Sequence, residues 1–132
     1  MKYIVDTHAL IWFLEGNSRM GIAAKQVLEN QESQLILPAI ALAEAAFIVE
    51  RGKTSIPSVI DLHIAVNGDP RIVVYPLDRA IVEITNTLLS INEMHDRQIV
   101  ATAIILKNQG AEASVLTCDR NITASGVVPI IW

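Results

Sequence analysis

Four short, largely apolar runs recur along the chain, and a segment with helical periodicity separates each run from the next. The runs are YIV at 3–5, QLILP at 34–38, RIVVYP at 71–76 and SVLT at 114–117. Short runs without polar alternation are typical of parallel strands that are buried on both faces. Parallel strands need long crossover connections, which are usually helices. The pattern therefore predicts a parallel sheet with helices on both faces.

Capping and turn residues set the bounds of the expected helices. Gly16, Gly52 and Gly110 each follow a helical pattern, as glycine does where a helix ends. Pro38 and Asp78 stand where helices begin, because proline fits the first turn and aspartate caps it. We expect helices over 7–15, 19–30, 38–51, 57–67, 79–90 and 96–109, and a short fifth strand within 128–132. The predicted fold is a three-layer α/β/α structure with a mostly parallel sheet of four to five strands.

Length and composition limit the class of protein. The chain has 132 residues, which predicts a single domain over 1–132. Hydrophobic residues make up 52% and charged residues 18%, enough for a packed core. The net charge of −4 excludes a protein that holds nucleic acid through overall charge, although a local basic rim stays open. No segment resembles a signal peptide or a membrane span, so we expect a soluble, cytoplasmic protein.

A single cysteine excludes an intramolecular disulfide and a cysteine-based zinc site. The chemistry of the chain must therefore come from other side chains. Carboxylates are the most informative of these, because several stand where an apolar or turn residue is expected.

Glu44 is the only charged residue in the apolar stretch IALAEAAFIV at 40–49. No residue three or four positions away on a helix is a cation, so no ion pair within the helix compensates it. Apolar residues on all sides predict a buried helix. A buried carboxylate without a partner is strongly unfavourable or stays protonated. Glu44 therefore needs a partner from elsewhere in the fold.

Three aspartates complete a candidate site. Asp6 follows the first strand, Asp119 follows the fourth, and Asp96 opens an apolar helix. In parallel sheets, ligands bind beyond the carboxyl ends of the strands, where these acids and Glu44 can meet. Four carboxylates within roughly 5–8 Å repel by about 2–3 kcal/mol per pair at an effective dielectric constant near 20. A divalent cation relieves this repulsion, and oxygen ligands alone favour Mg²⁺ or Mn²⁺ over zinc.

Each acid also has an ordinary structural interpretation. Asp6 and Asp96 are suited to cap helices, and Asp119 is suited to a turn. Glu44 could instead form a long-range pair with an arginine. The four positions together favour the metal site more than any one of them does.

Four segments that contain these acids resemble the motifs of the PIN domain. They are VDTHALIWFLEG at 5–16, LPAIALAEAAFIVERGK at 37–53, HDRQIVATAIILKNQG at 95–110 and LTCDRNI at 116–122. The start and the closing Trp132 are similar to a subgroup that consists mostly of VapC-type toxins. The chain departs from that subgroup at EMHDR, where Glu93 and Met94 replace an aspartate and a proline. Asn121 stands where some relatives have a further acid.

The resemblance implies a Mg²⁺- or Mn²⁺-dependent endoribonuclease that leaves 3′-hydroxyl and 5′-phosphate ends. Asp6, Glu44, Asp96 and Asp119 would be both its catalytic residues and its metal ligands. The implied role is the toxin of a type II toxin–antitoxin pair, with a PIN nuclease of RNA processing as the alternative. The implied partners are an RNA substrate, a cognate antitoxin protein and a second copy of the chain in a homodimer.

Neighbours of the acids are candidates for supporting roles. Thr7 and Thr117 are placed to hydrogen-bond the ligating carboxylates, or else to cap and pack. Arg97 and Arg120 adjoin the third and fourth acids and are candidates to contact phosphates, or else lie on the solvated surface.

Histidine and aromatic residues near the first motif are weaker candidates. His8 and His95 lie beside motif acids, but a metal-activated water needs no histidine as base. Trp12 and Phe13 are expected to pack in the core more often than to stack on bases.

Three other classes stay open on the residues alone. A haloacid-dehalogenase-like hydrolase needs a second aspartate where this chain has His8. A response-regulator receiver needs an acidic pair, which VDTH lacks. A metal-free interaction module would pair the acids with a partner's arginines.

Overall fold

The computed structural model covers residues 1–132 and is built around one five-stranded sheet in the order β3-β2-β1-β4-β5. All four neighbouring pairs are parallel, as predicted, and the last strand expected within 128–132 is present. The strands are β1 Lys2–Val5, β2 Gln34–Pro38, β3 Ile72–Tyr75, β4 Ala113–Leu116 and β5 Ile130–Ile131.

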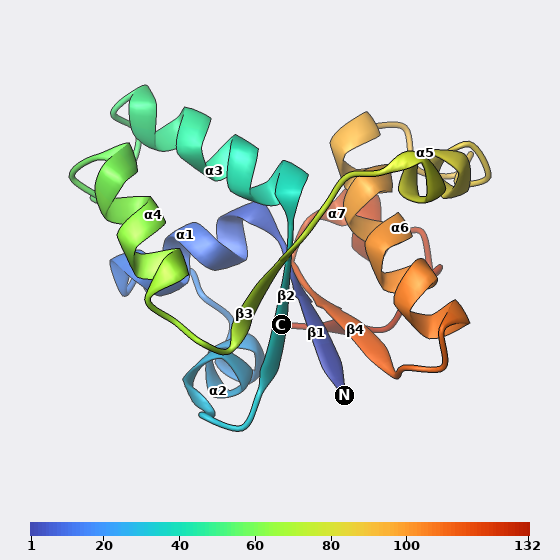
Figure 1. Ribbon diagram of the computed structural model, residues 1–132, viewed down its shortest axis with the longest axis horizontal. Helices are drawn as coiled ribbons and strands as arrows, with labels where there is room; N and C mark the ends of the chain where they lie inside the picture. The colour runs from blue at the N-terminus through green and yellow to red at the C-terminus, as the bar shows by residue number, and fades with distance from the viewer.

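Seven helices form the outer layers. Their bounds are α1 Thr7–Glu15, α2 Ile22–Glu29, α3 Ala39–Glu50, α4 Val59–Asn67, α5 Arg79–Thr85, α6 Met94–Asn108 and α7 Arg120–Thr123. Figure 1 shows the sheet nearly edge-on, with α1 to α4 on one side and α5 to α7 on the other. The three-layer α/β/α prediction is therefore confirmed. None of the seven helices is long and apolar enough to cross a membrane.

The central strands form the core, for the reason that their sequences indicate. All four residues of β4 are buried, and so are the last four residues of β2. The outer strand β3 differs, because Val73 and Val74 are 54% and 40% exposed at the edge of the sheet. Buried apolar residues from both layers of helices pack against the strands in a single cluster.

Four predicted helices differ from the observed ones by two residues or more at one end. Two of them, expected from residues 19 and 57, begin at Ile22 and Val59. The helix expected over 79–90 ends at Thr85, and turns occupy the residues that follow. The helix expected from Asp96 begins at Met94, because the Glu93 side chain caps it by accepting a hydrogen bond from the Asp96 N–H at 2.9 Å. The short helix α7 was not predicted, since four residues are too few to show a periodicity.

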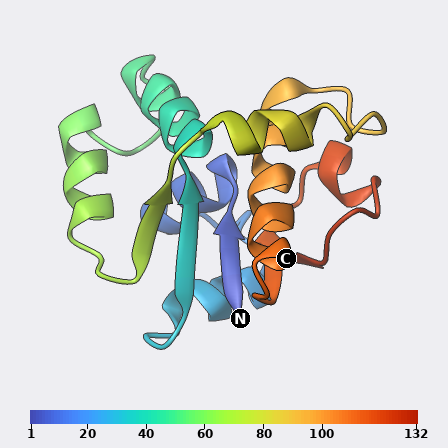
Figure 2. The ribbon, with the colours of Figure 1, turned by 45° about the vertical axis from the view of Figure 1, so that its right-hand side comes forward.

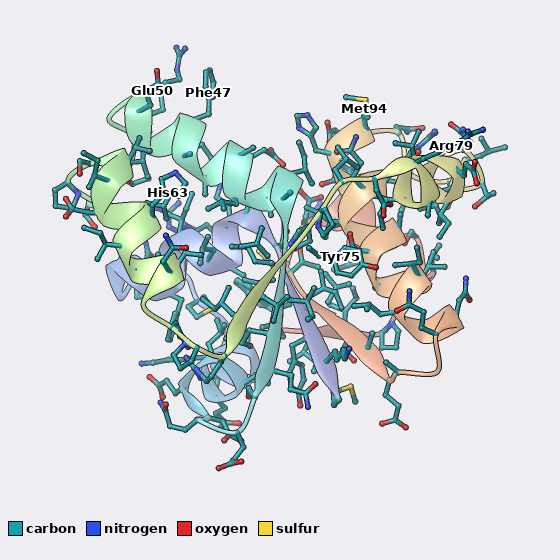
Figure 3. All side chains as sticks on the ribbon, viewed as in Figure 1. Phe47, Glu50, His63, Tyr75, Arg79 and Met94 are labelled. Atoms are coloured by element: carbon teal, nitrogen blue, oxygen red, sulfur yellow. The ribbon has the colours of Figure 1, made fainter.

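Helix α3 is also less buried than its apolar sequence predicts. Ala41, Ala45 and Val49 face the core, whereas Phe47 on the opposite face is 56% exposed. Figure 3 shows Phe47 pointing away from the body of the protein. The prediction of a helix buried on all sides was wrong, because an apolar helix gives no signal as to which face the sheet covers.

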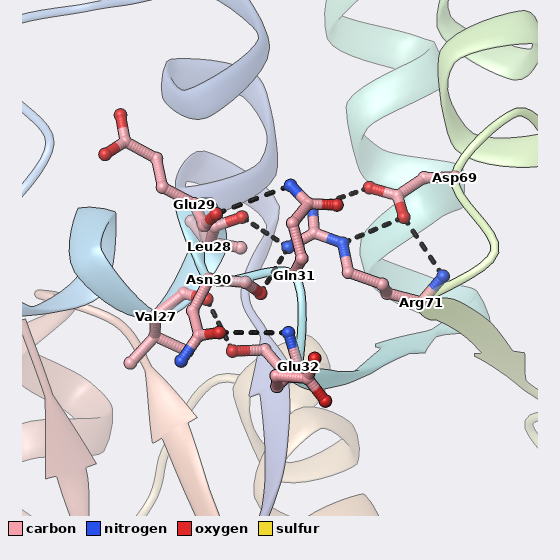
Figure 4. Close-up of polar contacts among 9 residues, drawn as sticks. Val27, Leu28, Glu29, Asn30, Gln31, Glu32, Asp69 and Arg71 are labelled. Atoms are coloured by element: carbon pink, nitrogen blue, oxygen red, sulfur yellow. Dashed lines mark hydrogen bonds and ion pairs between the residues drawn. The ribbon is translucent and has the colours of Figure 1, made fainter.

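A cluster of hydrogen bonds around Arg71 joins the connection between α2 and β2 to the start of β3 (Figure 4). Arg71 donates hydrogen bonds to the carbonyls of Leu28 and Asn30 at 2.7 and 2.8 Å, and it pairs with Asp69 at 2.8 Å. Hydrogen bonds from Arg71 hold the pKa of Asp69 below its usual value. These contacts lie at the amino ends of the strands. Helices α1, α3 and α6 begin on the opposite side, at the carboxyl ends of the strands (Figure 2). Asp6 directly precedes α1, Glu44 lies within α3, Asp96 lies in the first turn of α6, and Asp119 follows β4.

Candidate functional site

Asp6 lies at the junction between β1 and α1 and is held from both elements. One carboxylate oxygen accepts a hydrogen bond from the Thr7 N–H at 2.7 Å, which caps α1. The other oxygen accepts a hydrogen bond from the Thr117 hydroxyl at 2.5 Å. Thr117 follows β4, and Val5 pairs with Leu116 in the parallel register. Adjacent strand ends therefore bring residues 6 and 117 together across the length of the chain.

Asp119 is joined to the same group through Thr117. Its backbone N–H donates to the Thr117 hydroxyl at 3.0 Å. Its side chain caps α7 by accepting from the Asn121 N–H at 2.8 Å. The turn predicted at this position is present as a helix start, and the charge of Asp119 raises the pKa values of Asp6 and Asp96.

Asp96 lies in the first turn of α6 and is only 7% exposed. Its carboxylate accepts a hydrogen bond from the Asn121 side-chain amide at 3.1 Å. Burial raises the pKa of Asp96 to about 6, and repulsion from Asp119, Glu93 and Asp6 adds to this rise. Because Glu93 caps α6, the carboxylate of Asp96 is not needed as the helix cap.

Glu44 reaches this group from α3 and is half-buried. One of its oxygens accepts a hydrogen bond from the Thr7 hydroxyl at 3.3 Å, and the other lies 3.4 Å from His95 Nδ1. No arginine or lysine contacts it, so the alternative of a long-range pair with an arginine was wrong. Burial raises the pKa of Glu44, and the charge of Asp6 raises it further.

The four acids thus form one electrostatic group without a lysine or arginine partner. Asp6 is also 7% exposed, and burial together with Asp119 raises its pKa against the hydrogen bonds from both threonines. The only ionic contact to any of the four is the one between His95 and Glu44. Burial of uncompensated carboxylates is unfavourable and is kept where function requires it.

A family model described as the PIN domain matches residues 3–126. The chain belongs to the PIN domain family. The resemblance that the four motifs indicated is thereby confirmed, and the PIN domain replaces the dehalogenase-like and receiver alternatives. No curated protein matches this sequence.

Solved structures show the same PIN fold. VapC20 from Mycobacterium tuberculosis, described as a sarcin-ricin loop cleaving toxin, is 15% identical with a TM-score of 0.70, covering 98% of this chain and 99% of that chain. VapBC2 from Rickettsia felis, bound to a DNA fragment from its promoter, is 16% identical with a TM-score of 0.70 and coverages of 98% and 97%. VapBC-1 from nontypeable Haemophilus influenzae is 19% identical with a TM-score of 0.68 and coverages of 98% and 96%.

The donor set of this PIN domain suits a hard cation, because all four acids offer oxygen ligands. As they stand, no three histidine, cysteine, aspartate or glutamate side chains are close enough to hold a metal ion. Burial is the main cause of the raised pKa values of Asp6, Glu44 and Asp96, and the charges of neighbouring acids raise them further. The residues fit Mg²⁺ or Mn²⁺ by type, and binding would require them to draw closer.

The neighbouring residues of the PIN domain fall into two groups. Thr7 and Thr117 bind the carboxylates of Glu44 and Asp6, as their positions beside the motif acids predict. Arg97 instead donates from Nε to the Ile91 carbonyl, which ties the start of α6 to the preceding turn.

Arg120 is exposed at the start of α7, and its contact with phosphate stays a prediction. Sequence reasoning missed the contact of Asn121 with Asp96. The signal available for it was an amide two positions after the fourth acid. The sequence also gave no reason to expect that His95 contacts Glu44 rather than its neighbour Asp96.

Proposed function

We propose that this PIN domain is a Mg²⁺- or Mn²⁺-dependent endoribonuclease and the toxin of a type II toxin–antitoxin pair. The observation that carries the proposal is the group formed by Asp6, Glu44, Asp96 and Asp119. They come from four separate segments, converge at the carboxyl edge of the sheet, and have no cationic partner except His95. The toxin described for the M. tuberculosis structure and the VapBC complexes support the assignment of substrate class and partner.

The four acids would hold the cation, and the surrounding residues would orient them. Bound there, Mg²⁺ or Mn²⁺ would make a water molecule more acidic and offset the negative charge of the phosphoryl oxygens. Thr7 and Thr117 fix both oxygens of Asp6. Asn121 fixes Asp96 in the same way. Such outer contacts set the direction of a ligand's lone pairs and typically affect metal affinity by about 10- to 100-fold.

Burial argues against the metal-free interaction module. Asp6 and Asp96 are each 7% exposed, so an arginine of a protein partner has little access to their carboxylates. A small ion and a water-sized nucleophile need much less space. The same burial would exclude water from the site. Fixed charges there would then stabilise the charge that develops on the scissile phosphate more strongly than they would in water.

Cleavage of total RNA by the purified protein tests the proposal. We expect cleavage with Mg²⁺ or Mn²⁺, none in EDTA, and none with Asp6→Asn or Glu44→Gln. Asp61→Asn is the matched control, because Asp61 is an exposed carboxylate in the first turn of α4, away from the four acids. Cleavage at the wild-type rate by either site variant would overturn the assignment. Mapping of the cut ends would identify the RNA that is recognised.

The toxin role and the partners need a separate test. We expect that production of the wild-type protein alone arrests growth of a bacterial host and that production of Asp6→Asn does not. Fractionation of the cells should find the wild type and the variant in the cytoplasm. We also expect a homodimer, and a cognate antitoxin that restores growth. Harmless production of an active enzyme would point instead to a nuclease of RNA processing, and a monomer mass by light scattering would contradict the dimer.

A further inference from the structure

An aromatic hollow adjoins the four acids on the side of Asp6 and Asp119. Its volume is about 160 Å³, and its lining combines these two carboxylates with the rings of His8, Trp12 and Trp132. Asp6, His8 and Trp12 belong to the segment around the start of α1, whereas Trp132 is the last residue described. The carboxyl edge of the sheet therefore carries aromatic surface directly beside the proposed catalytic acids.

The three rings are held in a fixed arrangement. The ring centroids of Trp12 and Trp132 are 5.8 Å apart at an interplanar angle of 62°, and those of His8 and Trp12 are 5.4 Å apart at 52°. Trp132 packs so closely on Gly21 that a Cβ atom there would lie 2.6 Å from the indole Cδ1. The prediction that Trp12 belongs to the core holds only in part, since both indoles are half-buried and line an open hollow.

The charges around the hollow suit a neutral ring attached to a phosphate. Asp6 and Asp119 would repel an anionic group placed in the hollow itself. Arg19 lies over the Trp12 ring, with its guanidinium 5.0 Å from the ring centroid. Arg19 is exposed and has no carboxylate partner, so its charge is available to a nucleic-acid backbone that leaves the hollow.

We propose that the aromatic hollow receives one unpaired base of the RNA substrate, next to the scissile phosphodiester bond. This inference rests on the proposed nuclease function, because it uses the four acids to place the phosphate. A phosphate would approach Asp6 and Asp119 only through a cation that these acids hold, and a base linked to that phosphate would meet the hollow that they also line. Stacking on aromatic rings accepts any of the four bases, and it needs a base that is free of a duplex. Trp12 and Trp132 would thus position the substrate without reading its sequence.

The two tryptophans provide a direct signal for binding. The chain contains only two tryptophans, and both line the hollow. We would mix the wild-type protein in Mg²⁺ with a short single-stranded RNA of mixed sequence in a stopped-flow instrument and follow the intrinsic fluorescence before the RNA is cut. Stacked bases should quench the emission, and an RNA of the same length without bases should not. Equal quenching by both RNAs, or by neither, would overturn the proposal.

Kinetics on an RNA that the wild type cleaves give a second measurement. Trp132→Ala should raise KM by about 5- to 150-fold, which is the effect of losing one stacked base. Gly21→Ala should raise KM as well, because its Cβ displaces Trp132 and leaves both indoles in the chain. Trp12→Phe keeps an aromatic face of smaller area and should raise KM less than Trp132→Ala does. Ile60→Ala, an exposed apolar residue on α4, is the control without effect.

Removing the base from the RNA separates stacking from a structural role. An abasic site beside the cut bond should weaken the wild type and leave Trp132→Ala without further loss. If Trp132→Ala and Gly21→Ala cleave at the wild-type KM while the wild type is an active nuclease, the hollow proposal fails and the nuclease stands. If the RNA quenches fluorescence through its bases but no condition gives cleavage, the nuclease fails and the base site stands.

Discussion

Replacing Asp96 by asparagine removes one negative charge from the centre of the four acids and changes little else. Asp96 as a whole is 7% exposed, and the pKa of its carboxyl is raised from 3.8 to about 6. The folded protein therefore binds this proton more tightly than the unfolded chain. Stability from this group is fully present below about pH 4 and is lost as the pH rises through about 6. Each unit of pKa corresponds to about 1.4 kcal/mol, so the loss at neutral pH is at most about 3 kcal/mol.

Asparagine escapes this loss, because it has no charge to bury. Its carbonyl oxygen can still accept the hydrogen bond that Asn121 donates to Asp96 at 3.1 Å. It gives up the favourable interaction of a negative charge with the start of α6, about 0.3–1 kcal/mol. Without divalent cations we therefore expect Asp96→Asn to be about 2 kcal/mol more stable than the wild type at neutral pH. The corresponding rise in Tm is about 5–10 °C.

Urea unfolding followed by circular dichroism, in EDTA and over a range of pH, measures this difference. The gap in the free energy of unfolding should be near zero at about pH 4 and should reach its full size above about pH 6. Asp61→Asn is the control, because Asp61 occupies the equivalent first-turn position of α4 but is exposed. A constant gap at all pH values, or a less stable Asp96→Asn at neutral pH, would refute the idea that Asp96 is buried beside other acids without a cation.

Three further outcomes follow from the same contacts. Saturating Mg²⁺ should stabilise the wild type, by about 2.7 kcal/mol at one hundred times Kd, and should leave Asp96→Asn nearly unchanged in thermal unfolding; equal shifts would contradict a shared cation. Thr117→Val should lower stability by about 1–3 kcal/mol, because it removes the donor to Asp6 and the acceptor for the Asp119 N–H, and an unchanged Tm would contradict this. Arg71→Ala should lower the free energy of unfolding in urea by about 2–4 kcal/mol, because the backbone carbonyls of the cluster lose their donor. Below its Tm the variant should cleave RNA at the wild-type rate. Slower cleavage would show that the cluster affects the site.

The positions of the four acids could be predicted because each follows a local signal. Asp6 and Asp119 come directly after strands whose apolar runs are visible in the sequence, and parallel strands end at the same edge of a sheet. Glu44 stands out because it has no cation within helical reach. The partners of these acids could not be predicted in the same way. Glu44 meets Thr7 and His95 from two other elements, and their sequence distance carries no signal of contact.

The sequence by itself determined the order of strands and helices, the parallel sheet and the end of the sheet where the acids lie, because periodicity and capping act between neighbours in the chain. Only the tertiary structure decided that α3 leaves Phe47 exposed. It also decided that Trp132 reaches Trp12 beside the acids. Such contacts depend on how the layers pack, since the free energy of burying a ring or a carboxylate is set by residues far away in the sequence.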